Sequence, residues 1–119
     1  MEYSIIIPTY KNYKYCKLTI DSIKKNSNFN HEIIVHINGN DNQTENYLIQ
    51  EKIKFTKSSK NIGLCSGVNT AYKKSTKKFI LYSHDDMYFL PGWDKALNDE
   101  VRKLNDGKFY LSLTQIAAH

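Results

Sequence analysis

Short runs of β-branched and other apolar residues alternate along this chain with apolar stripes at helical spacing. The runs predict strands over 4–7, 32–37, 52–56, 78–83 and 109–113. Pro8 is expected to end the first of them. The stripes predict helices over 13–25, 44–50, 64–72 and 93–104. Because the connections are short, this alternation predicts an α/β fold of three layers, with a mostly parallel sheet between helices.

The length of the chain fits one compact domain. At 119 residues, 40% hydrophobic and 24% charged, the sequence can enclose a single core, so we expect 1–119 to form one domain. Its apolar runs fall far short of the roughly 20 residues of a membrane span, and its N-terminus does not resemble a signal peptide. The expected location is therefore the cytoplasm. Cys16 and Cys65 lie in no metal or redox motif and are predicted to be reduced packing residues.

The chain is basic, with 17 Lys and Arg against 12 Asp and Glu, a formal net charge of +5. This surplus favours anionic partners but does not choose between nucleic acid, phosphorylated metabolites and simple solubility. The lysine-rich segment 73–78 is short, and a solvated helix end explains it better than a nucleic-acid patch. No nucleic-acid partner is therefore predicted.

Polar and glycine-containing segments follow four of the predicted strands. These segments are 8–10, 38–41, 58–67 and 84–86. In an open parallel sheet, ligands bind beyond the carboxyl ends of the strands, so these segments are the candidate site. The glycine-rich fingerprints of dinucleotide-binding and P-loop proteins do not occur in the chain. Gly63 and Gly67 fit a helix-entry turn and a ligand contact equally well.

Asp85 and Asp86 are the most specific local feature. Two adjacent carboxylates at a strand end can hold Mg²⁺ or Mn²⁺, with a diphosphate completing the coordination. His84 could add a nitrogen ligand for Mn²⁺, although a turn residue or a ring contact is the more frequent role of a lone histidine. The apolar segment 87–94 would suit a pocket wall or the packing of a helix start, and for Trp93 we expect packing.

Five ordered motifs together resemble the family 2 glycosyltransferases, inverting enzymes of the GT-A fold that use nucleotide-diphosphate sugars. The motifs are 4–10, 32–35 with 38–39, 61–63 with Asn69, 84–86, and 91–93. They cover nearly the whole chain. Each motif is modest alone, but their order and spacing make the match specific.

The resemblance implies a nucleotide-sugar pocket with a divalent metal. Its candidate residues are Pro8, Thr9, Tyr10, Asn38, Asn61, Gly63, Asn69 and Asp85. Those at 8–10 would line the nucleoside pocket, those at 61–69 would shape its far side, and Asp85 would approach the ribose or diphosphate. Asp86 would bind Mn²⁺ or Mg²⁺, with His84 as a further candidate ligand.

Two positions depart from the family pattern. His84 occupies the first place of the family's DxD-type motif, where aspartate is usual. Ile37 occupies the place of a base-recognising aspartate, which leaves Asn38 as a substitute candidate. The family's catalytic base lies in the half that follows the fifth strand. Because the chain stops at His119, just after that predicted strand, we name no catalytic base and expect the acceptor half to be lacking.

More than one class of function stays open. The first is a metal-assisted, inverting glycosyltransferase, with a glycan, a lipid or a protein as acceptor. The alternative is a non-catalytic nucleotide-sugar-binding module or a fragment of a larger transferase. A nucleotidyltransferase is a weaker third option, because it would need a basic glycine-rich phosphate loop near the N-terminus. A homo-oligomer is compatible with each of these functions.

Overall fold

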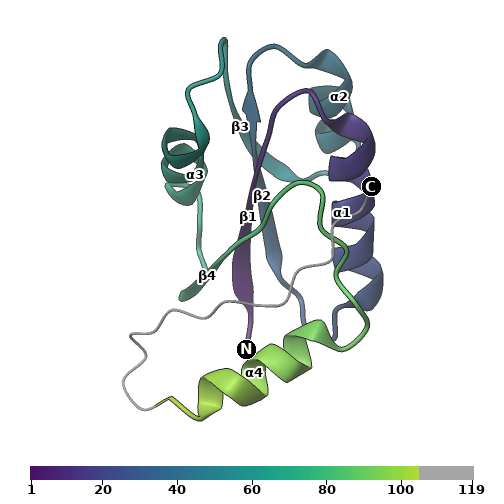
Figure 1. Ribbon diagram of the computed structural model, residues 1–119, viewed down its shortest axis with the longest axis vertical. Helices are drawn as coiled ribbons and strands as arrows, with labels where there is room; N and C mark the ends of the chain where they lie inside the picture. The colour runs from purple at the N-terminus through teal and green to yellow at the C-terminus, as the bar shows by residue number, and fades with distance from the viewer. Residues whose placement is uncertain (105–119) are drawn as a thin grey trace.

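Strands and helices alternate through residues 1–104, the part of the chain that the computed structural model describes (Figure 1). The strands are β1 (Tyr3–Thr9), β2 (Glu32–Asn38), β3 (Lys54–Ser58) and β4 (Phe79–Tyr82). The helices are α1 (Tyr13–Asn26), α2 (Asn42–Gln50), α3 (Leu64–Tyr72) and α4 (Trp93–Arg102). The strand predicted at 109–113 lies outside the described residues. Within 1–104, every helix is too short or too polar to cross a bilayer.

The four strands form one parallel sheet in the order β3-β2-β1-β4. The chain builds outward from β1 to β3 and then returns to place β4 on the other side of β1, so strand order reverses between β1 and β4. Helices α1 and α2 cover one face of the sheet and α3 covers the other (Figure 1). The predicted three-layer α/β fold is confirmed.

The two faces of the sheet differ in polarity. Ile5 and Ile7 of β1 point into the large core beneath α1 and α2, whereas Ile6 packs on Ala71 of α3. Because side chains alternate along a strand, the α3 face also carries His36 of β2, next but one to Ile34 of the smaller core. One face is thus an apolar core, and the other contains buried polar groups.

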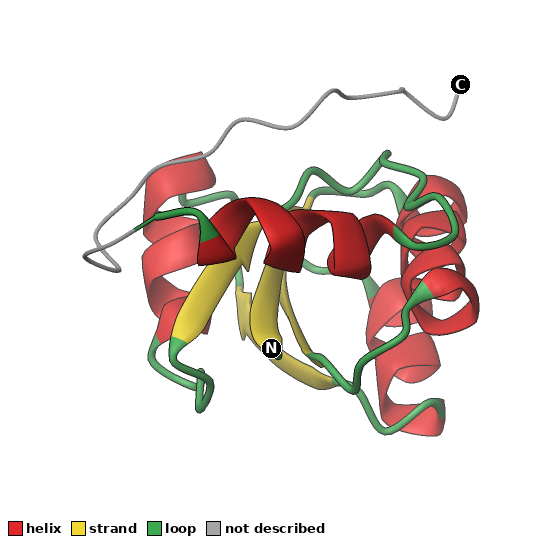
Figure 2. Cartoon of the chain, turned by 90° about the horizontal axis from the view of Figure 1, so that it is seen from below, coloured by secondary structure: helices red, strands yellow, loops and turns green. Residues whose placement is uncertain are grey.

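Helix α4 lies across the amino-terminal end of the sheet, as Figures 1 and 2 show. Asp94 of α4 is fully buried and accepts hydrogen bonds from His31 Nε2 and from the backbone N–H groups of Asn28 and Phe29, all at 2.8–2.9 Å. Trp93 packs on the main core, and its indole N–H donates to Ser27 Oγ, directly after α1. The expectation that Trp93 is a packing residue is confirmed.

The prediction that Pro8 ends the first strand is wrong, because β1 continues to Thr9. The Ile6 carbonyl accepts from Ser83 N, so the backbone groups of Ile6 point toward β4, and those of residue 8 must point the same way. Strand β4 has already ended at Tyr82. The N–H that Pro8 lacks would therefore have no neighbouring strand to bond, and proline is tolerated there.

Helix α2 and strand β3 also differ from the predicted ranges. Asp41 caps α2 by accepting from Thr44 N at 3.2 Å, so the helix begins at Asn42, two residues earlier than predicted. After α2, Lys52 adopts a left-handed backbone with φ of 57°. This turn delays the strand, which begins at Lys54, two residues later than predicted.

The apolar stripe predicted on α3 is rotated in the structure. Gly67 and Ala71 are the buried residues of this helix, whereas Leu64 and Tyr72 are more than half exposed. Both cysteines are free, as predicted, and Cys16 is buried, but the prediction that Cys65 is a packing residue is wrong. Two residues are about 200° apart around a helix, so Cys65 faces solvent while Gly67 faces the sheet.

Candidate functional site

A pocket of about 450 Å³ lies beyond the carboxyl ends of β1, β2 and β4, at the point where strand order reverses. Its lining comes from the segments that follow these strands and from the start of α3. The lining residues are Pro8, Thr9, Tyr10, Lys11, Asn12, Asn38, Asn61, Gly63, Leu64, Tyr82, His84 and Asp85. Parallel strands bring these segments together because their carboxyl ends share one edge of the sheet.

The segment after β4 is fastened to the end of β1 and to α1. Thr9 Oγ1 donates to Asp85 Oδ2 at 2.8 Å, and Thr19 Oγ1 of α1 donates to the Asp85 backbone carbonyl at 2.9 Å. The Met87 backbone N–H returns a hydrogen bond to Thr19 Oγ1 at 3.0 Å. Burial and the nearby Asp85 carboxylate raise the pKa of the Cys16 thiol to about 12, so this thiol stays protonated behind the segment. Asp85 is therefore held at the tip of β1.

Two asparagines shape the wall between β2 and α3. Asn38 is 5% exposed, and its Oδ1 accepts from the Ile62 backbone N–H at 3.2 Å. Asn61 Oδ1 accepts from Gly63 N at 2.9 Å, which closes a turn directly before α3. Gly63 has a φ of 87°, a conformation that favours glycine. Its helix-entry role is thus clear, and it also lines the pocket.

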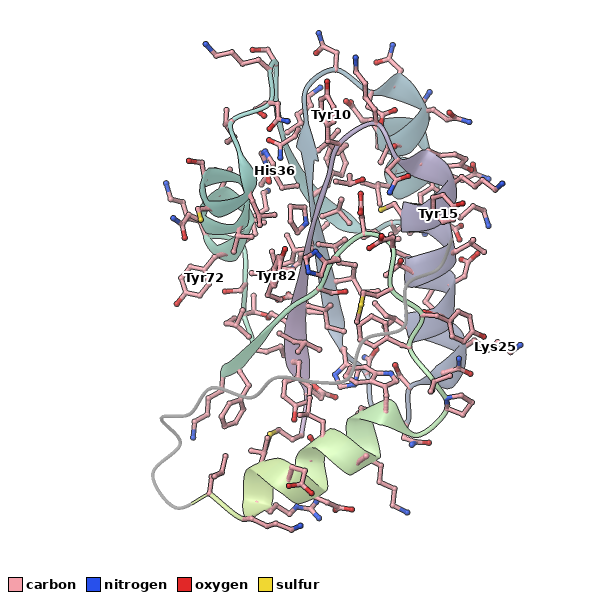
Figure 3. The ribbon with its side chains drawn as sticks, in the orientation of Figure 1. Tyr10, Tyr15, Lys25, His36, Tyr72 and Tyr82 are labelled. Carbon is pink, nitrogen blue, oxygen red and sulfur yellow. The ribbon has the colours of Figure 1, made fainter. Side chains whose placement is uncertain are left out.

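Tyr10 presents a half-exposed ring in the pocket, beyond the end of β1 (Figure 3). Gly39 leaves room beside that ring, since a Cβ at Gly39 would lie 3.7 Å from Tyr10 Cε1. Lys11 Nζ lies 5.6 Å from the ring centroid, within range of a cation–π contact. The Lys11 backbone is left-handed, with a φ of 45°. The first loop therefore offers a flat aromatic surface beside a cation.

The candidate metal ligands lie at the opposite side of the pocket, after β4. His84 is exposed, and its ring packs edge-on against Tyr82, with Nδ1 3.3 Å from the Tyr82 hydroxyl. Asp86 is partly buried and lies outside the pocket lining, next to Asp85. Within 1–104, His, Cys, Asp and Glu side chains form no group of three with the spacing of a metal site. A metal here would need ligands from a bound molecule or from water.

Most of the predicted binding residues come together in this pocket. Those that line it are Pro8, Thr9, Tyr10, Asn38, Asn61, Gly63, Asp85 and His84. Asn69 does not, because it is exposed on α3 away from the lining. The segment 87–94 does not form a pocket wall either, since Phe89 is 7% exposed in the main core and packs against Trp93.

Four lining residues were not among those predicted: Lys11, Asn12, Leu64 and Tyr82. Lys11 and Asn12 directly follow the predicted triplet 8–10, so extending the segment to the start of α1 would have included them. Tyr82 is the last residue of β4, a position that faces the ligand edge of a sheet. Leu64 had been assigned to the core stripe of α3, and only the rotation of that helix brings it to the pocket.

Two comparisons of the sequence agree with each other. Residues 4–116 match the model of a family described as "Glycosyl transferase family 2". The chain is also 36% identical over 120 residues to an "Uncharacterized glycosyltransferase" of Rickettsia bellii (strain RML369-C). That match covers 93% of this chain and 16% of the relative, so the chain spans only a small part of the relative's length.

Solved structures share the fold. A crystal structure of S. aureus TarS 1-349 superposes with a TM-score of 0.75 at 23% identity, covering 87% of this chain and 33% of that chain. The same score is found for its complex with UDP-GlcNAc. The mannosyltransferase PcManGT from Pyrobaculum calidifontis, in complex with GDP-Man and Mn²⁺, gives 0.69 at 18% identity, covering 81% of this chain and 30% of that chain.

Proposed function

The chain belongs to glycosyl transferase family 2, and on that premise we propose that it forms the donor-binding part of a glycosyltransferase that uses a nucleotide-diphosphate sugar. One observation carries the proposal: the segments after β1, β2 and β4, which hold the family motifs, line a single pocket where strand order reverses. The TarS and PcManGT structures, which share this fold, were solved with UDP-GlcNAc and with GDP-Man and Mn²⁺.

The nucleoside would bind at the side of the pocket formed by the first loop. The exposed face of the Tyr10 ring can stack on a base, and Gly39 leaves the space that a side chain would fill. The amide of Asn61 lies on the far wall, where it closes the turn before α3. The base itself is not assigned, because Ile37 stands where the family commonly has an aspartate.

The diphosphate would bind between the start of α3 and the segment after β4. Gly63 and Leu64 place the N-terminal end of α3 at the pocket, and the backbone N–H groups of a helix start attract anions. Lys11 adds a positive charge at the rim. Asp85, held by Thr9, would meet the ribose or approach the phosphates through a bridging cation.

The residues after β4 fit a divalent metal whose coordination the ligand completes. Mg²⁺ and Mn²⁺ are commonly held by one or two carboxylates together with substrate phosphates and water. Asp86 would be the principal ligand, and Asp85 and the His84 ring are the neighbouring donors. When bound, such a metal would stabilise negative charge on the leaving diphosphate. Because these donors are carboxylate oxygens and an imidazole nitrogen, we propose that the metal is Mn²⁺ or Mg²⁺.

The transfer itself would invert the sugar's configuration, as in the family. Negative charge develops on the diphosphate as the sugar leaves, and donors fixed in position stabilise that charge more than the ground state. Inversion also needs a general base near the acceptor hydroxyl, and we assign no residue to that role. The acceptor, a glycan, a lipid or a protein, is likewise not assigned. A cytoplasmic location remains our proposal.

The pocket would serve equally well in a non-catalytic nucleotide-sugar-binding module. The pocket lining favours this second candidate, because it includes Asp85 but not Asp86, and binding needs less charge compensation than transfer. Release of free sugar, or its transfer to an added acceptor, would support the transferase. Tight binding without turnover would support the module.

A thermal-shift panel tests the proposal directly. The chain is heated with UDP-, GDP-, ADP- and dTDP-linked sugars, each with and without Mn²⁺. A ligand that binds only the folded state raises the melting temperature, so at least one nucleotide sugar should do so, and more strongly with Mn²⁺. Melting temperatures that no nucleotide sugar changes, with no heat of binding by calorimetry, would contradict the proposal.

A further inference from the structure

His36 is a fully buried polar residue in β2, outside the lining of the pocket. It lies between the sheet and α3 (Figure 3). Its Nδ1 is 2.7 Å from Thr56 Oγ1, and its Nε2 is 3.3 Å from Ser58 Oγ, both on β3. Helix α3 passes so close that a Cβ on Gly67 would lie 2.9 Å from His36 Cδ2. The ring is therefore fixed on both sides.

The direction of these hydrogen bonds follows from Ser58. Its single hydroxyl proton is donated to the Lys60 backbone carbonyl at 2.7 Å, a much shorter contact than the 3.5 Å to Asn38 Oδ1, so Ser58 Oγ accepts from His36 Nε2–H. Thr56 then donates its hydroxyl proton to the unprotonated Nδ1. A neutral ring with its proton on Nε2 satisfies all of these contacts. The hydrogen bonds connect Thr56 of β3 to the ring, the ring to Ser58, and Ser58 to the segment 58–63.

This segment forms one wall of the pocket, since Asn61 and Gly63 belong to the lining. Two anchors hold it against β2. One is Asn38, which accepts from the Ile62 backbone N–H, and the other is Ser58, which joins the segment to the His36 ring. A change at His36 would therefore reach the pocket wall without any contact between the ring and a ligand.

We propose that His36 is a positioning residue for the nucleotide-sugar pocket: its neutral ring, acting through Ser58, holds segment 58–63 in the shape that receives the ligand. The proposal rests on the proposed function for the identity of the ligand. Its structural part, the link from the ring through Ser58 to the segment, can be tested with no ligand present.

The surroundings of the ring disfavour its protonated form. Burial lowers the pKa of His36 below its ordinary value and outweighs a hydrogen bond with the Asn38 side chain, which favours the protonated ring, so the ring is neutral at neutral pH. The described elements packed on it place uncharged groups against it, namely Pro8 of β1, Thr56 of β3 and Gly67 of α3. The charged pair on this face lies further along the strands, with Lys54 one side-chain row and Glu32 two rows from the ring. Acid would protonate Nδ1 and remove the acceptor that Thr56 uses.

The binding test compares Ser58→Ala with Ser59→Ala, a matched serine that is exposed and next in the chain. Calorimetry uses the nucleotide sugar that gives the largest thermal shift. Its diphosphate is esterified at both ends and so does not titrate near pH 6. We expect Ser58→Ala to bind roughly three- to tenfold more weakly, and Ser59→Ala to bind as the parent does. Equal affinity of all three proteins would overturn the proposal.

The pH profile separates positioning from simple loss of a hydrogen bond. Parent affinity should fall as the pH is lowered from neutral through the lowered pKa of His36, because the ring then gains its second proton. In Ser58→Ala this fall should disappear, since the ring no longer reaches the segment. A fall of the same size in both would contradict the role of His36.

Two measurements without ligand distinguish a failure of this inference from a failure of the proposed function. Ring ¹⁵N chemical shifts should show the Nε2–H tautomer at pH 7. The Ile62 amide should exchange with solvent faster in Ser58→Ala than in the parent. A parent that binds no nucleotide sugar refutes the proposed function alone. A ring protonated on Nδ1, or equal exchange at Ile62, refutes the positioning role alone.

Discussion

Thr9 Oγ1 and Asp85 Oδ2 lie 2.8 Å apart and join the last residue of β1 to the segment after β4. The two residues are 76 positions apart in the chain, and Thr9 is 2% exposed. Because Asp85 belongs to the acidic pair proposed to meet the diphosphate and its metal, this hydrogen bond sets where the pair stands relative to the nucleoside side of the pocket. The position of the pair thus depends on a buried side chain of another strand.

Replacing Thr9 with valine should weaken nucleotide-sugar binding while the protein stays folded. Valine has nearly the same shape but cannot donate to the carboxylate, and hydrogen bonds to charged groups contribute about 1.5–3 kcal/mol. We expect an affinity loss of about tenfold or more by calorimetry in the presence of Mn²⁺. Thr9→Ser keeps the hydroxyl and should bind within about threefold of the parent. Equal affinities for the valine and serine variants would argue against the anchor.

Asp86→Ala should abolish the part of nucleotide-sugar binding that depends on Mn²⁺. Asp86 lies in the segment after β4, outside the cores, so the variant should fold and melt near the parent temperature. Affinity measured without metal should change less, because the role assigned to Asp86 in binding is to hold the cation. Calorimetry that shows an unchanged, metal-stimulated affinity in Asp86→Ala would remove the metal assignment.

Two lysines with left-handed backbones allow strain and function to be separated. Lys11 has a φ of 45° at the pocket, and Lys52 has a φ of 57° in the turn after α2. Glycine adopts this region without the cost of about 1 kcal/mol that other residues incur. Urea unfolding should show Lys11→Gly and Lys52→Gly to be at least as stable as the parent. Only Lys11→Gly should lose affinity for the nucleotide sugar, and Lys11→Met should lose it similarly if the charge matters.

Strands β1, β2 and β4 could be predicted from the sequence because they contain continuous apolar runs, whereas β3 has only Phe55 as an apolar residue and was predicted two residues too early. The limits of β1 could not, since Pro8 is tolerated only because β4 ends before reaching it. The rotation of α3 was equally hidden, because it is set by the close approach of Gly67 to His36. Both facts depend on neighbours in space that the local pattern does not contain.

The residues of the candidate site could likewise be predicted from the sequence only in part. Residues directly after strands, such as Thr9 and Asp85, could be placed in the pocket because the carboxyl ends of parallel strands share one edge. Thr19 could not, since its hydroxyl reaches the Asp85 carbonyl only once α1 is packed. Asn69 was predicted from a family motif, and the phase of α3 turns it away from the lining.

Glu32 should make the stability of the protein depend on pH in acid. Burial opposes its ionisation, but hydrogen bonds from Lys54, Ser4 and Thr76 outweigh that effect and lower its pKa to about 2. A lowered pKa in the folded state adds stability above pH 4.5 that is lost as the pH falls toward 2. Glu32→Gln should therefore lower the free energy of unfolding by about 1–2 kcal/mol at pH 7. Glu100→Gln, at an exposed position, is the control variant.

Urea unfolding at pH 7, 4.5 and 2.5 checks this expectation. The difference between the parent and Glu32→Gln should shrink between the last two values, because the parent carboxylate is then losing its charge. Glu100→Gln should stay within about 0.5 kcal/mol of the parent throughout. A difference that does not change with pH would show that the hydrogen-bonded carboxylate is not what stabilises this end of the sheet.

Asp94 should be the residue whose loss most weakens the attachment of α4. Burial alone would raise its pKa, but hydrogen bonds from His31 and from the Phe29 and Asn28 backbone outweigh burial and lower it. Asp94→Ala would leave these three donors, whose hydrogen bonds are part-buried, without their acceptor, at a cost of about 1 kcal/mol each. We expect Asp94→Ala to lower the free energy of unfolding by about 3 kcal/mol or more. The parent should lose the same stabilisation in acid, as its Asp94 carboxylate becomes protonated.

Asp99→Ala on the same helix is the matched control, because Asp99 is exposed and its ion pair with Arg102 contributes little. The fluorescence of Trp93, the single tryptophan, reports the attachment directly, since its ring centroid lies 4.9 Å from that of His31. The pocket lies at the opposite end of the sheet, so a folded Asp94→Ala should still bind nucleotide sugar. If Asp94→Ala and Asp99→Ala unfold at the same urea concentration, the three donors must find other acceptors and α4 must be held by its apolar face alone.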